Sequence, residues 1–456
     1  MRKWARSMPN DGLIRYYTVG NLERVFPTST AALREVLVNK AYDFAKPRII
    51  QQFLYPIVGN GLLLAEGEEH KVQRKSLMPA FSYRHIKDLY PIFWTKSIEM
   101  VKGIEQDLQR RGPDEDNTIQ VRNWVGRAAL DIIGVAGMDQ DFDSLRNPSG
   151  RLNESYHKVF TLPSFGTKML LLLGRIIGDI AWVQSLPTKR NKDIQDGRQT
   201  IRDVARQMIR EKREKLKNAD SKTGLDIISV AMSGDSTFEE ERLVDQLMTF
   251  LAAGHETTAS AMQWAVYALS KRPEMQTRLR EEIRANLPSI SVERPEQIDA
   301  VTIDNLPYLH AVCNEVLRFH PVVPNTNRVA LKDTTLVGKP IPKGTTIVLV
   351  PEVINKLEEL WGPDADEFNP DRFMGQGMAN TGGASSNYAL LTFLHGPRSC
   401  IGQGFAKGEL ACLLAATVGR FKFELKYPDA KLEVQEGATR APKDGVLAKF
   451  TPVEGW

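Results

Sequence analysis

The sequence has few cysteines and no excess of one charge. Its 456 residues include three cysteines, Cys313, Cys400 and Cys412, which is too few for a disulfide framework and favours a reducing compartment. Lys and Arg number 60 against 56 Asp and Glu, a formal net charge of +4. Without a basic stripe with interleaved aromatics, we expect no nucleic-acid partner. The hydrophobic share of 42% and the charged share of 25% exclude a disordered or fibrous chain.

Long apolar runs are also missing. No stretch of about 18 uninterrupted apolar residues occurs, so no segment is predicted to span a membrane. The nearest approach runs from Met169 to Val183 and is interrupted by Arg175 and Asp179. It predicts either a partly buried helix or a segment that dips into a bilayer surface. The N-terminal residues MRKWARSMPNDG contain no apolar signal core.

The residue pattern predicts a mainly α fold with small β regions, an α+β class. Helices are expected over residues 83–110, 190–218, 239–271, 273–286 and 401–420. Strands are expected over residues 14–27, 334–337, 345–350 and within 432–451, with a turn at 338–340. Because the strands lie near both ends and the helices between them, we expect one domain over residues 1–456.

The segment around Cys400 is the strongest candidate for chemistry. In FLHGPRSCIG, residues 393–402, the cysteine follows Gly396-Pro397 and precedes a helix. The positive end of that helix and Arg398 would favour a thiolate. Gly396 and Gly402 permit a tight turn and the close approach of a flat group. A thiolate with one open face suits an axial ligand of iron, whereas Cys313 and Cys412 are expected to be ordinary buried residues.

A second candidate lies inside the long helix, from Ala253 to Thr258. Gly254 costs about 1 kcal/mol relative to Ala in a helix, so it needs a reason. The Thr257 hydroxyl can bond the Ala253 carbonyl and open the helix locally, while Gly254 leaves room for a small molecule such as dioxygen. Glu256 adds a carboxylate for proton transfer. Read alone, these residues also fit a solvated helix with a tolerated glycine.

Two charged pairs complete the set. Glu315 and Arg318, at i and i+3, share one helix face and could form a buried network with Arg372, although a surface ion pair is the alternative. His70 and Arg74, at i and i+4, point the same way from a helix. Two parallel donors would suit a carboxylate, and an exposed charged helix is the alternative.

Together and in this order, these segments resemble the cytochrome P450 haem-thiolate monooxygenases, in the fungal-like microsomal branch of eukaryotes. The family loop Phe-x-x-Gly-x-Arg-x-Cys-x-Gly is matched at Phe393, Gly396, Arg398, Cys400 and Gly402. The oxygen-helix pattern is matched from Ala253 to Thr258, and the Glu-x-x-Arg pair at Glu315 and Arg318, while Arg372 resembles the meander arginine. The resemblance covers nearly the whole chain.

The resemblance implies a role for each residue. Cys400 would be the thiolate ligand of the iron of haem b, within the cofactor loop that also contains Phe393, Gly396 and Gly402. The propionates would be held by His70, Arg74, Arg328 and Arg398; His70 stands where members commonly have Trp. Ala253, Gly254, Glu256 and Thr257 would serve oxygen activation and proton delivery. Glu315, Arg318 and Arg372 would fix the cysteine loop. The segment 354–360 departs from the family pattern, and we expect only a local surface change there.

The resemblance also implies the reaction and the partners. O2 would be a co-substrate, and electrons from NADPH would arrive through a separate cytochrome P450 reductase, or cytochrome b5, docking on a basic face that includes Arg398 and Lys407. The substrate would be a hydrophobic small molecule, such as a fungal secondary metabolite. Its pocket would be lined by residues 47–64, 156–169, 247–253, 321–327 and 445–447. Alternatives are a haem-thiolate enzyme for oxidative coupling, isomerisation or dehydration, and a non-catalytic α-rich binding protein.

The location follows from the same resemblance. The full-length protein is expected at the cytosolic face of the endoplasmic reticulum membrane. The chain as given lacks the anchor that such proteins carry, so we expect it to be largely soluble and monomeric.

Overall fold

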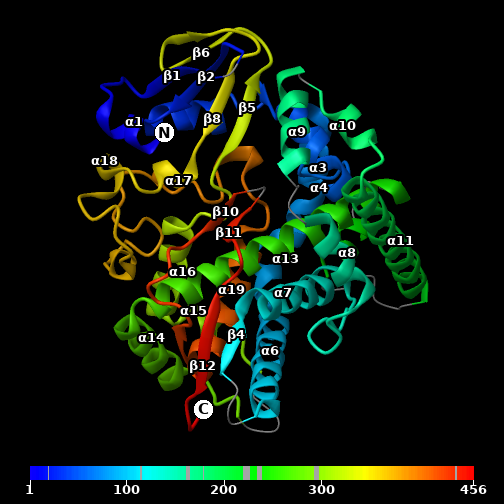
Figure 1. Cartoon of the computed structure of the whole chain (residues 1–456), viewed down its shortest axis with the longest axis vertical. Coiled ribbons are helices and arrows are strands. Elements are labelled where there is room, and N and C mark those ends of the chain that lie inside the picture. Colours follow the sequence, from blue (N-terminus) through cyan, green and yellow to red (C-terminus); the bar gives the residue numbers. More distant parts are fainter. Residues whose placement is uncertain are drawn as a thin grey trace.

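The computed structural model describes residues 1–18, 20–112, 116–160, 165–177, 179–218, 226–233, 239–291, 297–436 and 439–456. The predicted fold class is confirmed, because helices dominate and the strands form several small sheets (Figure 1). The longest helices are α6 (Tyr90–Arg110), α7 (Val121–Met138), α11 (Lys189–Asn218), α13 (Glu240–Ser270), α14 (Pro273–Asn286) and α19 (Gln403–Arg420).

Shorter helices and turns of helix surround these six. They are α1 (Arg2–Ser7), α2 (Thr30–Arg34), η1 (Glu35–Asn39), α3 (Arg48–Val58), α4 (Gly67–Leu77), η2 (Met78–Phe81), α5 (Tyr83–Lys87), α8 (Arg151–Phe160), α9 (Phe165–Ile177), α10 (Ala181–Ser185), α12 (Ile227–Ser233), α15 (Ala300–Asp304), α16 (Pro307–Phe319), α17 (Pro351–Ile354), α18 (Glu358–Trp361), η3 (Pro370–Phe373), η4 (Asn387–Ala389) and η5 (Gly396–Arg398).

The largest sheet has the order β1-β2-β8-β5-β3. Its strands are β1 (Leu13–Thr18), β2 (Leu22–Pro27), β3 (Phe44–Ala45), β5 (Thr326–Ala330) and β8 (Thr346–Leu349). Three smaller sheets pair β4 (Thr118–Gln120) and β9 (Phe421–Leu425) with β12 (Leu447–Pro452), β6 (Thr334–Leu336) with β7 (Lys339–Ile341), and β10 (Val434–Glu436) with β11 (Arg440–Pro442). The sheet β1-β2-β8-β5-β3 therefore joins strands from both ends of the chain.

Two predicted elements differ from the structure. The helix expected over residues 83–110 is two helices, α5 and α6, because Pro91 lies in the first turn of α6 and starts a new helix. The turn expected at residues 338–340 falls at Val337 and Gly338, which both have positive φ. Residues 339–341 therefore return as β7 beside β6, with Leu336 opposite Lys339, and β8 pairs instead with β2 and β5.

Helix α13 crosses the middle of the fold (Figure 1). It packs extensively against α7 and also contacts α3, α11, α16 and α19. Most of its length is buried, including Leu247, Leu251, Met262 and Trp264. A second hydrophobic core lies around the sheet β1-β2-β8-β5-β3. Side chains exposed in the middle of α13 therefore face space inside the protein.

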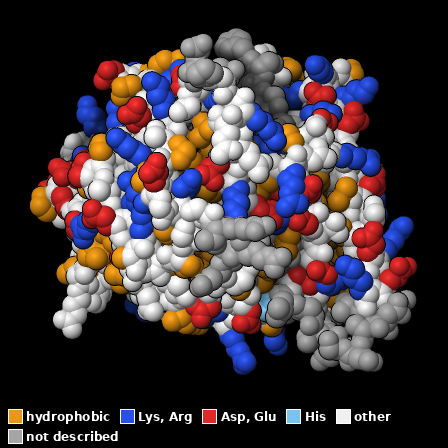
Figure 2. Space-filling model, turned by 90° about the horizontal axis from the view of Figure 1, so that it is seen from below, with side chains coloured by type: hydrophobic (Ala, Val, Ile, Leu, Met, Phe, Trp, Pro, Cys, Tyr) orange, Lys and Arg blue, Asp and Glu red, His pale blue; other side chains and the backbone are white. Residues whose placement is uncertain are grey.

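No helix in the described part of the chain is both long enough and apolar enough to cross a bilayer. The face in Figure 2, seen from below the view of Figure 1, carries interspersed acidic and basic side chains with scattered apolar ones.

Candidate functional site

The loop that carries Cys400 is held by backbone geometry. Gly396 has φ +77°, and a Cβ there would lie 2.1 Å from the Leu37 carbonyl oxygen. Only glycine fits this position. The Cys400 backbone N–H donates to the Phe393 carbonyl at 2.9 Å, which closes the loop. Gly402 is the N-cap of α19, so Cys400 lies directly before that helix.

The Cys400 thiol is accessible and yet enclosed. It is exposed by surface area, while surrounding protein raises the pKa of Cys400 by burial. A side chain that faces an internal space is both accessible to a small molecule and surrounded by protein, so the two observations agree. The Gly402 N–H and the Arg74 charge oppose the rise. The helix end thus favours the thiolate as expected, and Arg74 does so in place of Arg398, but burial outweighs both for the thiol by itself. Bonding to a metal would remove the proton.

The helix segment from Ala253 to Thr258 faces a similar interior space. Ala253 is exposed although it lies in the middle of central helix α13. The Thr257 hydroxyl donates to the Ala253 carbonyl at 2.7 Å, which is the predicted bond. However, α13 is continuous through these residues, so the expected local opening is absent.

Gly254 and Glu256 differ from their predicted arrangement. A Cβ on Gly254 would lie 2.9 Å from the Ile133 side chain, so this glycine is required for close packing on α7, and its side-chain position offers no room for dioxygen. The Glu256 carboxylate lies 3.4 Å from the Thr439 hydroxyl. The structure thus joins Thr257 to Ala253 and directs Glu256 to another segment.

Phe81 connects the cysteine loop to α13, and α19, which follows the loop, contacts α13 directly. Phe81 lies against Gly402, with 3.9 Å from its ring to a Cβ built there, and its ring centroid is 5.5 Å from that of Phe250 on α13. Further along α19, the Thr258 hydroxyl donates to Glu409 at 2.8 Å. Burial raises the pKa of Glu409 well above its usual value. Sequence reasoning missed Glu409, which an acidic residue beside the apolar run LACLLAA could have revealed.

The structure brings the three predicted charged residues together. Glu315 and Arg318 are fully buried, with a bidentate contact of 2.6 and 2.7 Å. Arg372 Nε lies 3.3 Å from the same carboxylate, and its guanidinium also pairs with Asp364 at 2.8 Å. Arg318 donates as well to the carbonyls of Asn355, Ala365 and Glu367. This arrangement fixes the long segment after α16.

Asn355 connects this network to the cysteine loop. Its amide donates to the Arg318 carbonyl at 3.1 Å and to the Thr392 hydroxyl at 2.9 Å, and it accepts from the Leu391 N–H at 2.8 Å. Asn355 and Lys356 are buried. The expected surface change in segment 354–360 is therefore wrong for its first half, since these residues support the loop from inside.

A basic cluster, Lys46, Arg74, Arg328 and Arg398, borders the cysteine loop. Arg74 donates to the Ser399 carbonyl at 2.7 Å, and Arg398 donates to the Phe44 carbonyl at 2.6 Å and pairs with Glu66. Lys46 Nζ lies 3.6 Å from the same Glu66 carboxylate. Glu66 is the carboxylate that these contacts share, so the cluster carries a surplus of buried positive charge.

The pKa values in the cluster reflect this surplus. Burial, with Arg328 and Arg398 nearby, lowers the pKa of Lys46 to about 7. Burial, followed by Arg398, lowers the pKa of Arg328 to about 10. The pKa of His70 falls to about 4 from burial and the neighbouring cations, so His70 is neutral at pH 7. Its Nδ1 lies 3.1 Å from the Tyr42 hydroxyl; when Tyr42 donates, Nε2 carries the proton and can donate in turn.

These residues fit a haem group. Two propionates would supply the negative charge that the basic cluster lacks, and Arg398 Nε is buried without a partner in the described chain. Cys400 presents an accessible sulfur beside Arg74, and thiolate is an established axial ligand of haem iron. Lys46 was missed in the sequence because an isolated lysine carries no pattern.

We expect Lys46 to make haem binding depend on pH. Propionates favour charged Lys46, so above its pKa of about 7 haem uptake requires a proton, and affinity falls as pH rises. We expect haem-free protein to bind haem less tightly at pH 8.5 than at pH 6.5, by up to about tenfold per pH unit, and Lys46→Met to weaken binding and flatten this dependence. Haem titration followed by absorbance measures both. Equal slopes for the two proteins would remove Lys46 from the site.

Several segments expected around the substrate meet at α13. The Thr249 hydroxyl donates to the Val58 carbonyl at 2.8 Å, and the Tyr156 and His255 rings lie 4.6 Å apart. Within the expected segment 156–169, residues 161–164 lie outside the described chain. Of the expected segment 445–447, Gly445 packs on β4, since a Cβ there would meet Gln120. Residues 439–440 reach α13 instead, since the Trp264 ring N–H donates to the Arg440 carbonyl.

Of the two expected docking residues, Arg398 is buried and paired with Glu66, so the prediction is wrong for Arg398. Lys407 is half-buried, and burial lowers the pKa of Lys407. Exposed basic residues lie instead on α4, at Lys71 and Lys75, and on α5, at Arg84; Arg74 anchors α4 to Ser399.

The fold and this site define a protein built to hold haem through a cysteine thiolate. Comparison with known proteins agrees, because a model of the cytochrome P450 family matches residues 11–448. The chain belongs to this family and is an enzyme of the cytochrome P450 monooxygenase class.

Three fungal relatives illustrate the similarity. Cytochrome P450 monooxygenase sphH of Aspergillus fumigatus is 64% identical over 456 residues, all of this chain and 84% of the relative. Cytochrome P450 monooxygenase FSL4 of Gibberella zeae is 43% identical, over all of this chain and 84% of its own. Cytochrome P450 monooxygenase FUM15 of Gibberella moniliformis is 42% identical, over 99% of this chain and 83% of its own.

Proposed function

We propose that this chain is a haem-thiolate monooxygenase that oxidises a hydrophobic small molecule, of the fungal secondary-metabolite kind, with O2 and with electrons from a separate NADPH–cytochrome P450 reductase. The observation that carries the proposal is the accessible Cys400 sulfur, bordered by the basic cluster and connected to α13 through Phe81, which lies against Gly402 and Phe250. When bound, haem supplies the redox chemistry of oxygen activation.

The residues of the chain would then act as follows. Cys400 ligates the iron, and the basic cluster with His70 binds the propionates. Arg318, Glu315 and Arg372 hold the segment after α16, and Asn355 transmits this rigidity to the loop before Cys400. Thr257 holds a hydroxyl proton on α13, fixed by its bond to the Ala253 carbonyl. Because the segments around the site are largely apolar, they exclude water and favour a hydrophobic substrate.

The proposal is tested by substrate binding and turnover. Lipophilic metabolites are screened for a change in the haem absorption spectrum on binding, and those that bind are tested with reductase, NADPH and O2. Product that gains one oxygen atom from labelled O2, in a reaction that needs reductase, supports the proposal. Product formed without O2 would support the coupling, isomerase or dehydratase chemistry instead.

Replacing Thr257 tests the proton role. We expect Thr257→Ala to lower product formation at least about tenfold, within the range for loss of a proton-transfer group, while NADPH use persists and hydrogen peroxide accumulates. Product, NADPH and peroxide are measured in the same reaction.

The matched control is Thr258→Ala at the next position. Thr258 bonds Glu409 rather than the Ala253 carbonyl, so this variant should lose stability but retain the ratio of peroxide to product in the folded enzyme. A similar ratio for Thr257→Ala and the wild type would contradict the proton role of Thr257.

We also propose that helix α9 rests on the cytosolic face of the endoplasmic reticulum membrane. Met169, Leu172, Leu173 and Ile177 are exposed, Ile177 by 68%, and Trp182 on α10 adds an exposed aromatic ring. Amphipathic helices with such faces bind at the bilayer interface. Of the two predictions for this segment, the exposure favours the bilayer surface over a buried helix.

Loss of this apolar surface should reduce membrane binding. We expect Leu172→Ser with Leu173→Ser to lower co-flotation with neutral phosphatidylcholine vesicles by at least about tenfold, because each leucine is about half exposed and burying that half contributes roughly 0.7–1.5 kcal/mol. Val72→Ser with Val301→Ser, which removes exposed apolar side chains elsewhere, is the control. Equal losses in both double variants would show that α9 is not the contact.

The electron donor would dock beside α4 and α5. Lys71, Lys75 and Arg84 present positive charge there, and Val72, Met78 and Tyr83 are exposed between them. Such a surface suits an acidic partner, because charge steers association while apolar side chains add contact area. Its proximity to Ser399, through Arg74, keeps the electron path to Cys400 short.

A further inference from the structure

A second cavity lies between α6 and α7, apart from the cysteine loop. Its volume is about 840 Å³, within the range of small-molecule sites. Its walls are the C-terminal half of α6, the first turns of α7, Gln120 of β4 and the turn at residues 145–148. None of its lining residues belongs to the cysteine loop, the basic cluster or the Ala253–Thr258 segment, so haem and substrate binding leave it unexplained.

Trp124 and Arg127 form a rigid part of the wall. A Cβ on Gly103 would lie 2.6 Å from the Trp124 ring, so glycine on α6 allows the indole to pack closely. The Arg127 guanidinium lies 4.1 Å from the centre of the Trp124 ring. It also donates to the carbonyls of Asn123 at 3.0 Å and Leu145 at 3.1 Å. Arg127 is thus held in place by the indole and by neutral acceptors.

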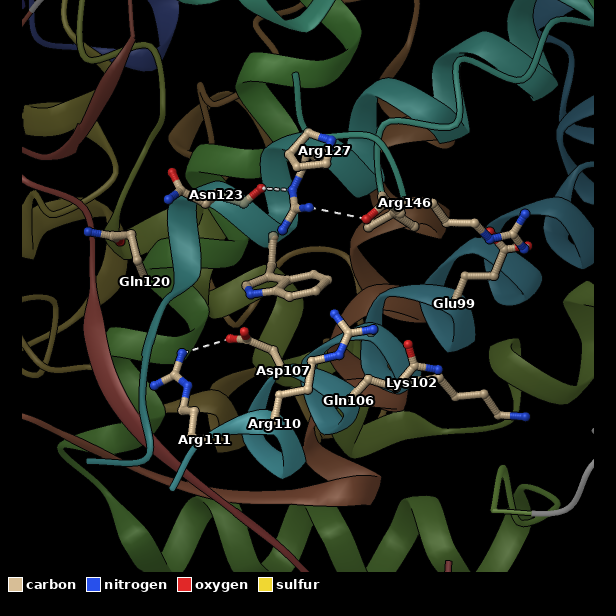
Figure 3. Close-up of a pocket in the computed structure, with 14 residues that line it drawn as sticks. Glu99, Lys102, Gln106, Asp107, Arg110, Arg111, Gln120, Asn123, Arg127 and Arg146 are labelled. Carbon is tan, nitrogen blue, oxygen red and sulfur yellow. Dashed lines mark hydrogen bonds and ion pairs between the residues drawn. The ribbon is translucent and has the colours of Figure 1, made fainter. Parts of the chain in front are cut away.

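The described lining of this cavity is strongly basic. It contains five cationic side chains, Lys102, Arg110, Arg111, Arg127 and Arg146, against the two carboxylates Glu99 and Asp107. Asp107 pairs with Arg111 at 2.7 Å, and Glu99 pairs with Lys96 at 3.0 Å and with Arg146 at 3.7 Å. Arg110 is exposed and has no ion pair within the described residues. Figure 3 shows Arg110 and Arg127 entering the cavity from α6 and α7.

This charge is concentrated locally. The whole chain has a net charge of only +4, and the face in Figure 2 carries interspersed acidic and basic side chains. Burial is the largest cause that lowers the pKa of Arg127, so an anion beside it would be stabilising. Guanidinium forks match the oxygens of phosphate in paired hydrogen bonds.

We propose that this cavity binds a small phosphate-bearing metabolite with at least two negative charges, held by Arg110 and Arg127. A membrane phosphate is disfavoured, because α6 runs toward the end of the molecule opposite the apolar surface of α9 (Figure 1). A nucleic-acid backbone is disfavoured as well, since the positive charge is confined to one cavity and forms no stripe.

Calorimetric titration of the haem-loaded enzyme tests the proposal, with pyrophosphate, ATP and citrate as probes at low ionic strength. We expect the phosphate compounds to bind. The double variant Arg110→Gln with Arg127→Gln should lower their affinity about ten- to hundredfold, as for loss of charged hydrogen bonds. Added salt should lower the affinity as well. The haem spectrum should stay unchanged, which shows that the variant is folded. Equal binding of ATP and pyrophosphate would show that the phosphate groups alone are recognised, whereas tighter ATP binding would indicate a nucleotide.

Two control variants distinguish binding in this cavity from nonspecific electrostatic attraction of anions to the protein. Arg34→Gln with Lys343→Gln removes two exposed charges elsewhere and should leave binding within about twofold. Asp114→Asn with Glu115→Gln removes two carboxylates that follow Arg111 in the sequence and lie outside the described residues; it should leave binding unchanged or tighten it. The proposal would be overturned if the Arg34/Lys343 variant lost as much affinity as the Arg110/Arg127 variant, or if removal of Asp114 and Glu115 weakened binding. It would also be overturned if citrate bound as tightly as pyrophosphate, or if no probe bound.

Discussion

Replacing Cys400 with serine should abolish the thiolate signature of the enzyme. Reduced wild-type protein with carbon monoxide should show the red-shifted Soret band of thiolate-ligated haem, and Cys400→Ser should lose this band together with monooxygenase turnover. The reason is chemical, because a serine hydroxyl is a much weaker donor to iron than a thiolate and cannot supply the same electron density. Difference spectra of reduced protein, before and after carbon monoxide, measure the effect.

The other two cysteines are the matched controls. Cys313 and Cys412 are buried, and burial raises their pKa values, that of Cys313 to about 12. Cys313→Ala and Cys412→Ala should therefore retain the band with only a loss of stability. A red-shifted band that survives Cys400→Ser would show that another side chain ligates the iron, and the proposed function would fail with it.

Replacing Glu315 with glutamine should have the second largest effect, a lower stability of the folded protein. The substitution keeps the shape but leaves Arg318 and Arg372 buried without their shared carboxylate. Loss of one partner of a buried ion pair typically costs about 3–5 kcal/mol. We expect a lower free energy of unfolding by this amount, together with faster loss of haem, because the network fixes the loop before Cys400. Denaturant unfolding followed by haem absorbance and far-ultraviolet circular dichroism measures both.

Two further variants keep this prediction testable. Glu359→Gln, at an exposed position, should stay within about 0.5 kcal/mol of the wild type. Asn355→Ala keeps the ion pair but removes its hydrogen bonds to Thr392 and Leu391, so it should cost about 1–3 kcal/mol and still release haem faster. Normal stability and normal haem retention in Glu315→Gln would mean that the network does not support the site.

Local patterns predicted several of the long helices well, although they missed α7. The run from Pro273 to Asn286 carries its own start signal, and the structure has α14 with these bounds. The charge-rich run at 190–218 and the apolar run at 239–271 match α11 and α13 within one residue at each end. Strand pairing was harder, because β8 pairs with β2 from the other end of the chain, and no local pattern encodes that contact.

Within the site, the sequence predicted contacts between residues that are close in the chain, but it did not predict contacts between distant ones. Glu315 and Arg318 are three residues apart on one helix, so their spacing already indicates a contact. Lys46, Glu66 and Arg398 come from three distant segments, and only folding shows that one carboxylate serves both cations. For the same reason, Arg398 was expected on the surface and is buried.

The sequence by itself determined the chemistry of this protein, a cysteine in a glycine-bounded loop before a helix, with a Thr-bearing central helix and a Glu-x-x-Arg pair in a fixed order. These features depend on residue type and on spacing of a few residues, which the chain carries directly. Only the tertiary structure decided that Gly254 serves packing, that Asn355 joins the Glu315 network to the cysteine loop, and that α6 and α7 enclose a basic cavity. The physical reason is that burial and charge balance arise from distant segments brought together on folding.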